Sequence, residues 1–226
     1  MDMIIKFLCA AISSGTPLLF GTVGEILNEK VGHLNLGVEG MMSVGACAGF
    51  MAGYYTDNFL IAILAAALGG MLTAFIYALL TVTFMTNQNV TGLALTTLGV
   101  GISDFMIAKS GTSFGRASKY FTASLPFADD LGWFGELFLS HGFLIYLAIA
   151  LALISSFVLS KTRIGLNLRA VGENPATADA AGINVIRYKY VATCLGGIIA
   201  GLGGLYFIMD YTGGSWTSGG FGDRGW

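Results

Sequence analysis

Charged residues are scarce in this sequence. Asp, Glu, Lys and Arg make up only 11% of the 226 residues, whereas 55% are hydrophobic. Residues 58–103 contain no charged residue at all. A water-soluble domain has no way to hide such apolar runs from water, but a bilayer accepts them as spans of its hydrocarbon core. The composition therefore predicts a protein that crosses a membrane several times.

A marked excess of either charge is also missing. The 11 basic residues nearly balance the 13 acidic residues, so the sequence lacks the excess of positive charge that is typical of nucleic-acid-binding proteins. We therefore expect the lipid bilayer, and no nucleic acid, among the partners of this chain.

Residues that commonly carry catalysis or hold metals are few. Three cysteines, Cys9, Cys47 and Cys194, lie far apart within apolar runs and form no Cys-x-x-Cys pair. The two histidines, His33 and His141, lie at the edges of apolar stretches. No Gly-x-x-x-x-Gly-Lys-Ser/Thr loop is present that would hold the phosphates of ATP. These absences predict no catalytic residue, no metal ligand and no cofactor bound by this chain.

Long apolar stretches indicate an all-α fold with about six membrane-spanning helices. A helix rises about 1.5 Å per residue, so about 20 apolar residues cross a hydrocarbon core about 30 Å thick. We expect these helices to form a single transmembrane domain over residues 1–226. The six stretches are approximately residues 4–26, 40–56, 59–86, 91–108, 141–160 and 190–209.

The distribution of Lys and Arg predicts the side of the membrane that each loop occupies. Residues 161–189 hold five of the 11 basic residues, and short loops with such an excess remain on the cytoplasmic side. We therefore expect 161–189 to be a cytoplasmic loop. Alternation of the spans then places the N-terminus and an extracytoplasmic loop at 109–140 outside, and residues 28–39 inside.

The stretch GHLNLGVEG, residues 32–40, fits neither a free loop nor a regular helix. It is too apolar for a loop in water and too rich in glycine for a helix. We expect irregular backbone there, and at membrane depth such backbone needs polar partners from the protein or a water-filled cavity.

Glycine is abundant, with 33 residues, and two sets of glycines repeat at helical spacing. Gly45, Gly49 and Gly53 are four residues apart, as are Gly197 and Gly201. This spacing lines small residues along one face of a helix, which allows the backbones of membrane helices to approach closely. We interpret these glycines as packing surfaces inside the bundle.

A short helix is predicted in the cytoplasmic loop by the stretch GENPATADAAG, residues 172–182. Asn174 is a preferred N-cap, Pro175 suits the first helical position, and Gly182 can take the left-handed conformation that ends a helix. A helix of about two turns is marginal alone, so we expect it to dock. The helix docks either on the bundle of this chain or on a cytoplasmic partner protein.

Three blocks of the sequence resemble permease subunits of ABC importers. The stretch TRIGLNLRAVGENPATADAAGIN, residues 162–184, is similar to the loop that carries a coupling helix for the ATPase subunit in that family. GEILNEKVGHLNLGVEGMMSVGA, residues 24–46, and NQNVTGLAL, residues 87–95, resemble blocks of the branch that imports nucleosides and simple sugars. The blocks occur in the same order, and the resemblance covers nearly the whole chain.

The resemblance implies a multi-pass permease in the plasma membrane of a bacterium, with three protein partners. A cytoplasmic ATPase subunit would bind ATP, a second permease subunit, identical or not, would complete the path, and an extracytoplasmic binding protein would deliver the solute. Family members continue beyond a Gly-rich loop such as residues 213–226, so we expect the chain to be truncated at its C-terminal end. The residues implied to couple to the ATPase are Gly172, Glu173, Asn174, Pro175, Ala178, Asp179 and Gly182.

Polar residues within the apolar stretches are candidates for lining the path, because polar groups are costly at membrane depth. Asn87 and Gln88 interrupt the uncharged stretch, and their amides can both donate to and accept from solute hydroxyls. The alternative is that they form a simple cytoplasmic turn. Asn35 and Glu39 lie in the irregular stretch, where Glu39 either contacts solute or caps a helix that begins at Gly40. We favour the cap.

Asp104 lies near the outer end of an apolar stretch. We favour its pairing with Lys109, about one turn further on, over the alternative that it contacts solute.

The favoured function is import of nucleosides by an ATP-driven permease, with simple sugars as the alternative cargo. A secondary transporter is a second alternative, although ion coupling usually requires buried acids and residues 58–103 have none. A membrane scaffold without transport activity is the third.

Overall fold

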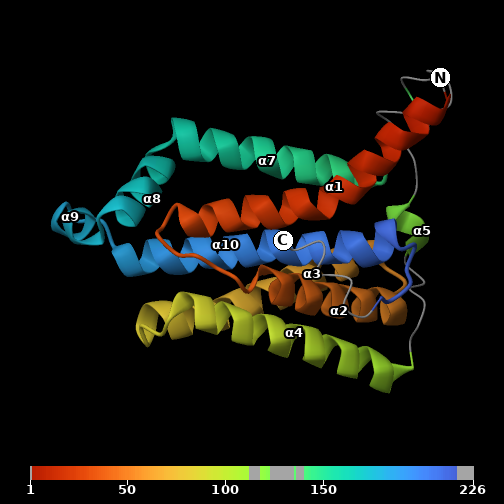
Figure 1. Ribbon diagram of the computed structural model, residues 1–226, viewed down its shortest axis with the longest axis horizontal. Coiled ribbons are helices and arrows are strands. Elements are labelled where there is room, and N and C mark those ends of the chain that lie inside the picture. The colour runs from red at the N-terminus through yellow and green to blue at the C-terminus, as the bar shows by residue number, and fades with distance from the viewer. Residues whose placement is uncertain (1, 112–117, 123–134, 136–139, 218–226) are drawn as a thin grey trace.

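The computed structural model describes residues 2–111, 118–122, 135 and 140–217, and these residues form helices and no strand (Figure 1). The all-α fold predicted from the sequence is confirmed. The long helices are α1 (Asp2–Glu29), α2 (Val38–Thr56), α3 (Phe59–Ala78), α4 (Gln88–Ser110), α7 (Phe143–Lys161) and α10 (Val185–Tyr206). Short π-helical turns extend α3 (Leu79–Thr83) and α10 (Phe207–Tyr211).

Five helices in the described part of the chain are long and apolar enough to cross a membrane. They are α1, α3 with its π turn, α4, α7, and α10 with its π turn. The sixth predicted span is α2, which is less apolar and lies between α3, α4 and α10. Eleven of its 19 residues are buried. Little of α2 therefore faces lipid, and it needs fewer large apolar side chains than the other spans.

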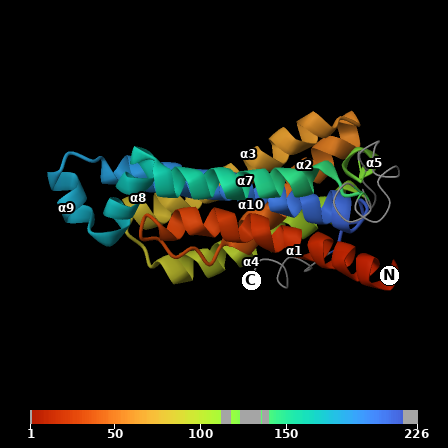
Figure 2. The ribbon, with the colours of Figure 1, turned by 90° about the horizontal axis from the view of Figure 1, so that it is seen from above.

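Helix α10 is the centre of the bundle. It packs against α1, α2 and α3. In the most apolar stretch of α10, 78% of the residues are buried, compared with 17% in the most apolar stretch of α7. Figures 1 and 2 show α7 on the outside of the bundle, where it runs alongside α1. The core therefore lies around α10, and α7 is the most peripheral span in the described residues.

Glycines bring the central helices into backbone contact, as their spacing predicts. A Cβ atom built on Gly45 of α2 would lie 2.4 Å from the Cα of Gly201 in α10. One built on Gly70 of α3 would lie 2.1 Å from the carbonyl oxygen of Gly197. Small faces of this kind are the usual way in which membrane helices associate.

The loops gather at two ends of the bundle. Helices α8 (Arg163–Glu173) and α9 (Pro175–Ala180) lie at one end with the turn between α3 and α4, and α5 (Ser118–Phe121) lies at the other end with the N-terminus (Figure 1). The helices therefore alternate in direction as the predicted topology requires. The predicted extracytoplasmic loop 109–140 lies largely outside the described residues.

Helix α8 was not expected from the sequence. Thr162 caps it by accepting a hydrogen bond from the backbone N–H of Gly165, and Leu168 and Val171 are buried on one of its faces. Leu166 is exposed on the opposite side, and Ile164, at the start of the buried face, is also exposed. The helix is amphipathic and links α7 to α9.

Candidate functional site

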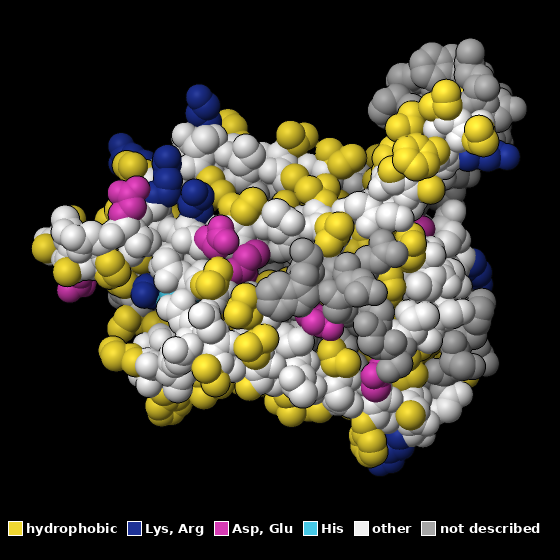
Figure 3. Space-filling model, viewed as in Figure 1, with side chains coloured by type: hydrophobic (Ala, Val, Ile, Leu, Met, Phe, Trp, Pro, Cys, Tyr) yellow, Lys and Arg dark blue, Asp and Glu magenta, His cyan; other side chains and the backbone are white. Residues whose placement is uncertain are grey.

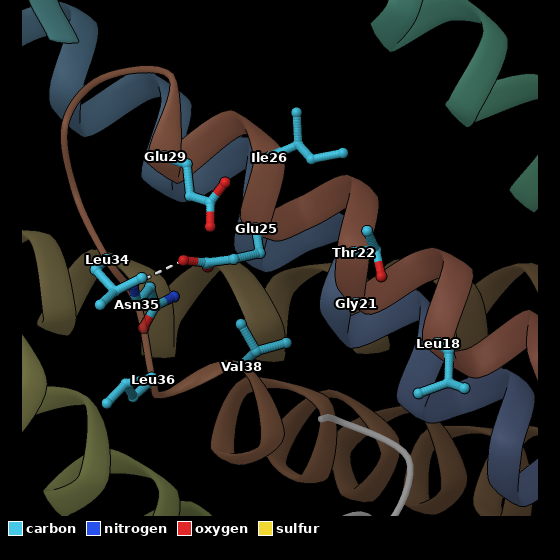
Figure 4. A pocket seen from close by; sticks show the side chains of 10 residues that line it. All are labelled: Leu18, Gly21, Thr22, Glu25, Ile26, Glu29, Leu34, Asn35, Leu36 and Val38. Carbon is cyan, nitrogen blue, oxygen red and sulfur yellow. Dashed lines mark hydrogen bonds between the residues drawn. The ribbon is translucent and has the colours of Figure 1, made fainter. Parts of the chain in front are cut away.

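A groove opens between α1 and the irregular segment that follows it (Figure 4). Its volume is about 290 Å³, which is at the lower end of the range for small-molecule sites. We call it the α1 groove. It is lined by Leu18, Gly21, Thr22, Glu25, Ile26, Glu29, Leu34, Asn35, Leu36 and Val38.

The polar side of the α1 groove consists of one face of α1. Thr22, Glu25 and Glu29 are spaced by three and four residues, which places them along a single helix face. Figure 4 shows the Glu25 carboxylate directed toward Asn35 across the groove. Thr22 and Glu29 are exposed although they belong to a candidate membrane span.

Glu25 anchors the irregular segment to α1. Its Oε1 accepts a hydrogen bond of 2.7 Å from the backbone N–H of Asn35, and its Oε2 accepts one of 3.2 Å from Nδ2 of Asn28. Each carboxylate oxygen can accept a further bond, so Glu25 can hold the segment and still bind a hydroxyl in the groove.

The irregular backbone predicted at residues 32–40 is present between α1 and α2, and side chains satisfy its polar groups. The backbone N–H of Leu34 donates to Oε1 of Gln88 at 2.9 Å, and its carbonyl accepts from the hydroxyl of Tyr77 at 2.9 Å. The carbonyl of Leu36 accepts from the hydroxyl of Thr96 at 2.9 Å. These partners come from α3 and α4, so the segment is held from three sides.

His33 in this segment is a packing residue. Its ring is 2% exposed and lies edge-on to the ring of Tyr77. Burial, together with the positive charge of Lys189, lowers the pKa of His33 to about 4. The imidazole is therefore neutral near pH 7 and adds no charge to the groove.

The predicted path residues occupy three different places. Asn35 lines the α1 groove, but its Oδ1 accepts from the backbone N–H of Gly37 and its Nδ2 contacts the sulfur of Met41. Asn87 is exposed at the end of the bundle that carries α9, and it caps α4 by accepting from the N–H groups of Asn89 and Val90.

Gln88 connects the turn between α3 and α4 to the α1 groove, because its amide oxygen accepts the hydrogen bond from the backbone N–H of Leu34. Of the four predicted path residues, the structure therefore brings Asn35 and Gln88 to the same irregular segment. Asn87 is built into the turn between α3 and α4.

Two predictions about acidic residues are wrong. Helix α2 begins at Val38 with Gly37 as its N-cap, so Glu39 lies within the first turn and does not cap a helix beginning at Gly40. Asp104 accepts a hydrogen bond of 2.9 Å from the indole of Trp216. The expected interaction with Lys109 had considered only residues near in sequence.

Figure 3 shows Asp and Glu side chains near the middle of one face and several Lys and Arg side chains at the end that carries α8. Side chains of both charges also occur elsewhere on this face. The acidic part includes the α1 groove with Glu25 and Glu29.

The predicted short helix, placed at 174–182 by the sequence, forms at Pro175–Ala180 with Asn174 and Gly182 at its two ends. Asn174 accepts a hydrogen bond of 3.0 Å from the backbone N–H of Thr177. Gly182 has a φ of +82°. The N–H groups of Gly182 and Ile183 donate to the carbonyls of Asp179 and Ala178, which is the hydrogen-bond pattern of a Schellman motif.

Helix α9 protrudes from the bundle (Figures 1 and 2). Ala178 is 3% exposed and packs with Val31, Leu168, Val171 and Ala192. The other five residues of α9 are exposed. One side chain therefore fixes the helix to this chain, and the rest of its surface is open.

The sequence as a whole matches one family of proteins. The model for the permease component of the branched-chain amino acid transport system covers residues 7–223. The chain belongs to this family. The ABC permease predicted from three sequence blocks is confirmed, and with it a multi-pass membrane protein that is a transport component and not an enzyme.

Three relatives illustrate the similarity. The permease is 33% identical to TsgC13 of Haloferax volcanii, provisionally named as a glucose ABC transporter permease, over 100% of the chain and 69% of that protein. It is 31% identical to the guanosine ABC transporter permease NupQ of Bacillus subtilis, over 90% of the chain and 68% of the relative. The nucleoside ABC transporter permease NupC of Lactococcus lactis is 32% identical, with 88% and 65% covered.

The permease spans about two thirds of the length of these relatives. No solved structure matches it.

Three polar residues that line the α1 groove, Thr22, Glu25 and Glu29, are not among the residues predicted from the sequence. The two acids fall at the end of the first apolar stretch, where charges usually mark the membrane boundary. Their spacing of four residues, with Thr22 three residues before Glu25, was the available signal. It indicates one polar helix face within a span.

Replacing Tyr77 with phenylalanine tests whether its hydroxyl stabilises the irregular segment. The change removes the hydroxyl that donates to the Leu34 carbonyl, a hydrogen bond that is partly buried, and loss of such a bond costs about 0.5–1.5 kcal/mol. We expect the unfolding temperature of the permease in detergent to fall accordingly. Tyr55→Phe is the matched control, because Tyr55 is 65% exposed. Equal unfolding temperatures for the two variants would contradict this role of Tyr77.

Proposed function

We propose that this chain forms one half of the translocation path of an ABC importer that takes up nucleosides. The names of NupQ and NupC support this cargo. The α1 groove supports it as well, because carboxylates and a hydroxyl line a cavity of about 290 Å³. Carboxylates accept hydrogen bonds from ribose hydroxyls and from the N–H groups of bases.

The exposure of the α1 groove is the observation that carries the proposal. Thr22 is exposed within a candidate membrane span, and Glu29, the last residue of that span, is exposed on the same helix face. A polar group that faces hydrocarbon is costly. Polar groups at this depth are expected to face a water-filled cavity or another protein. We infer that a second permease subunit, identical or related, covers this face and leaves the path between the two subunits.

Helix α9 is the proposed docking element for the ATPase subunit. Five of its six residues are exposed, and Asn174 and Gly182 fix both of its ends. Its exposed side chains are small, which allows close fitting into a groove on a partner. ATP would bind to that partner, and its binding would switch the permease pair between outward and inward access. An extracytoplasmic protein would deliver solute at the opposite end.

Simple sugars are the second candidate cargo, because TsgC13 is provisionally named as a glucose permease. The hydroxyls of a sugar would bond to Glu25 and Glu29 as those of ribose would. The relatives are named as ABC permeases, which favours ATP as the energy source over an ion gradient.

Uptake by cells that carry the complete reading frame tests the proposal. We expect labelled guanosine, adenosine or uridine to accumulate only with the gene and with ATP. Unlabelled nucleoside should block uptake, and excess glucose or ribose should not. Block by glucose would assign the permease to sugars, and uptake that survives ATP depletion would contradict an ABC importer.

A matched pair of variants locates the path in the same assay. Glu29→Gln removes a charge from the α1 groove and should lower nucleoside uptake about tenfold, since a bond to a charged group contributes about 1.5–3 kcal/mol. Asp57→Asn removes a charge at the opposite end of α2, outside the groove, and should leave uptake unchanged. Equal uptake by both variants would place the path elsewhere.

A further inference from the structure

A second groove separates α1 from α7, on a side of α1 that also includes Thr22 and Ile26. Its volume is about 450 Å³. Both flanking helices are candidate membrane spans, so the groove lies in the lipid-facing wall of the bundle. We call it the α1–α7 groove. It is lined by Leu19, Thr22, Val23, Ile26, Lys30, Ala152, Ser155, Ser156, Leu159, Ser160 and Arg169.

One end of the α1–α7 groove is cationic. Lys30 follows the last residue of α1, and Arg169 reaches the groove from α8. The backbone fixes this arrangement, because a Cβ atom on Gly172 would lie only 2.4 Å from the carbonyl oxygen of Lys30. Arg169 precedes Gly172 by three residues and so lies on the same face of α8.

The two cations have no acidic neighbour in the groove. None of its lining residues is Asp or Glu, and the ion pair found in the described part of the chain joins Lys119 and Asp57. Three hydroxyls, those of Ser155, Ser156 and Ser160 on α7, accompany the cations. The Ser160 hydroxyl donates to the carbonyl of Ser156 at 2.6 Å, so Ser155 and Ser156 are the candidate hydroxyl donors. Two like charges beside such donors form a site that favours an anion.

The rest of the α1–α7 groove is apolar. Leu19, Val23 and Ile26 line it from α1, and Ala152 and Leu159 line it from α7. A ligand that fits the whole groove therefore combines an anionic head with a hydrocarbon tail parallel to the helices.

We propose that the α1–α7 groove binds one anionic glycerophospholipid of the cytoplasmic leaflet. Its phosphate lies between Lys30 and Arg169, and one acyl chain runs along α1 and α7. Basic pockets between membrane helices on the cytoplasmic side are typical sites for anionic lipid head groups. The α1–α7 groove shares Thr22 and Ile26 with the α1 groove, but its lining contains neither Glu25 nor Glu29, and its cations lie at the end formed by Lys30 and Arg169.

The bound lipid has a structural consequence. α7 is the least buried span and makes few contacts with α1, yet α7 leads directly into α8 and α9. A lipid that fills the groove links α7 to α1 and thereby holds the base of α9.

Thermal unfolding of the protein from the complete reading frame, purified in detergent, tests the lipid site. We expect dioleoylphosphatidylglycerol to raise the unfolding temperature by about 5 °C. Dioleoylphosphatidylcholine and inorganic phosphate should not raise it. In Lys30→Gln/Arg169→Gln the effect of phosphatidylglycerol should disappear. In the control Lys161→Gln/Arg163→Gln it should remain, because those exposed cations belong to the same end but do not line the groove.

Two outcomes would overturn the proposal. One is an equal rise with phosphatidylcholine or with phosphate alone, which would show a detergent effect or a plain anion site. The other is a full response in Lys30→Gln/Arg169→Gln. If that variant does not fold, Ser155→Leu fills the groove without changing its charge. Native mass spectrometry should then detect no retained phosphatidylglycerol, and retention would overturn the lipid site.

Discussion

Replacing Gly204 with alanine is expected to disrupt the native packing of the bundle. A Cβ atom at this position in α10 would lie 2.0 Å from the carbonyl oxygen of Met42 and 2.7 Å from its carbonyl carbon. Both atoms belong to the backbone of α2, so the two central helices would have to separate. Overpacking costs about 1–3 kcal/mol where side chains can adjust, and we expect about 3 kcal/mol or more here. Thermal unfolding in detergent measures the loss.

Two other glycines provide controls for Gly204→Ala. Gly21 is also buried, but a Cβ atom there would lie 3.6 Å from the nearest atom, the Cγ1 of Val38. Gly101 on α4 is exposed and has no atom within 4 Å of such a Cβ. Alanine at either position should change stability by less than about 1 kcal/mol. If Gly204→Ala unfolds at the same temperature as Gly21→Ala, the close approach of α2 and α10 is not what holds the bundle.

The helices could be predicted from the sequence because their signal is local. Apolar stretches and glycine spacing identify each span and its small face without knowledge of the neighbours. The spacing does not show which helix faces contact each other. Gly45 and Gly201 were assigned to two separate repeats, and only the structure shows that they contact each other.

The ends of helices were less predictable, because capping depends on side chains several residues away. The first turn of α2 begins at Val38 because Asn35 accepts from the N–H of Gly37 and fixes the backbone before the helix. That interaction makes Gly37 the N-cap and displaces Glu39 into the first turn. At α9 the capping residues lie next to the helix, so its two ends followed from the sequence.

The candidate site depends on contacts between distant parts of the chain. Gln88 reaches Leu34 across 54 positions, and Trp216 reaches Asp104 across 112. An apolar stretch gives no indication of such partners. The sequence therefore identified Asn35 and Gln88 as unusual polar residues, but not that they support the same irregular segment beside Glu25.

Changing Glu173 to lysine and Asn174 to proline is expected to abolish uptake while the permease still inserts into the membrane. Asn174 caps α9 through the N–H of Thr177, and proline has no side-chain oxygen to replace this bond. Lysine reverses the charge at the start of the exposed helix. The bundle contacts α9 mainly through Ala178, so the membrane helices should stay folded. The amount of ATPase subunit that co-purifies with the permease should fall together with uptake.

Two single substitutions separate docking from helix stability. Asn174→Ala and Asn58→Ala each remove an asparagine that caps a helix, at α9 and at α3 respectively. Each loss costs about 1 kcal/mol of local stability, so the two variants should unfold similarly. Only Asn174→Ala should weaken ATPase binding and uptake, because Asn58 caps the start of α3, whereas the turn that follows α3 lies at the end of the bundle with α9. Full ATPase co-purification with Glu173→Lys/Asn174→Pro would show that α9 is not the docking helix, whatever solute the permease carries.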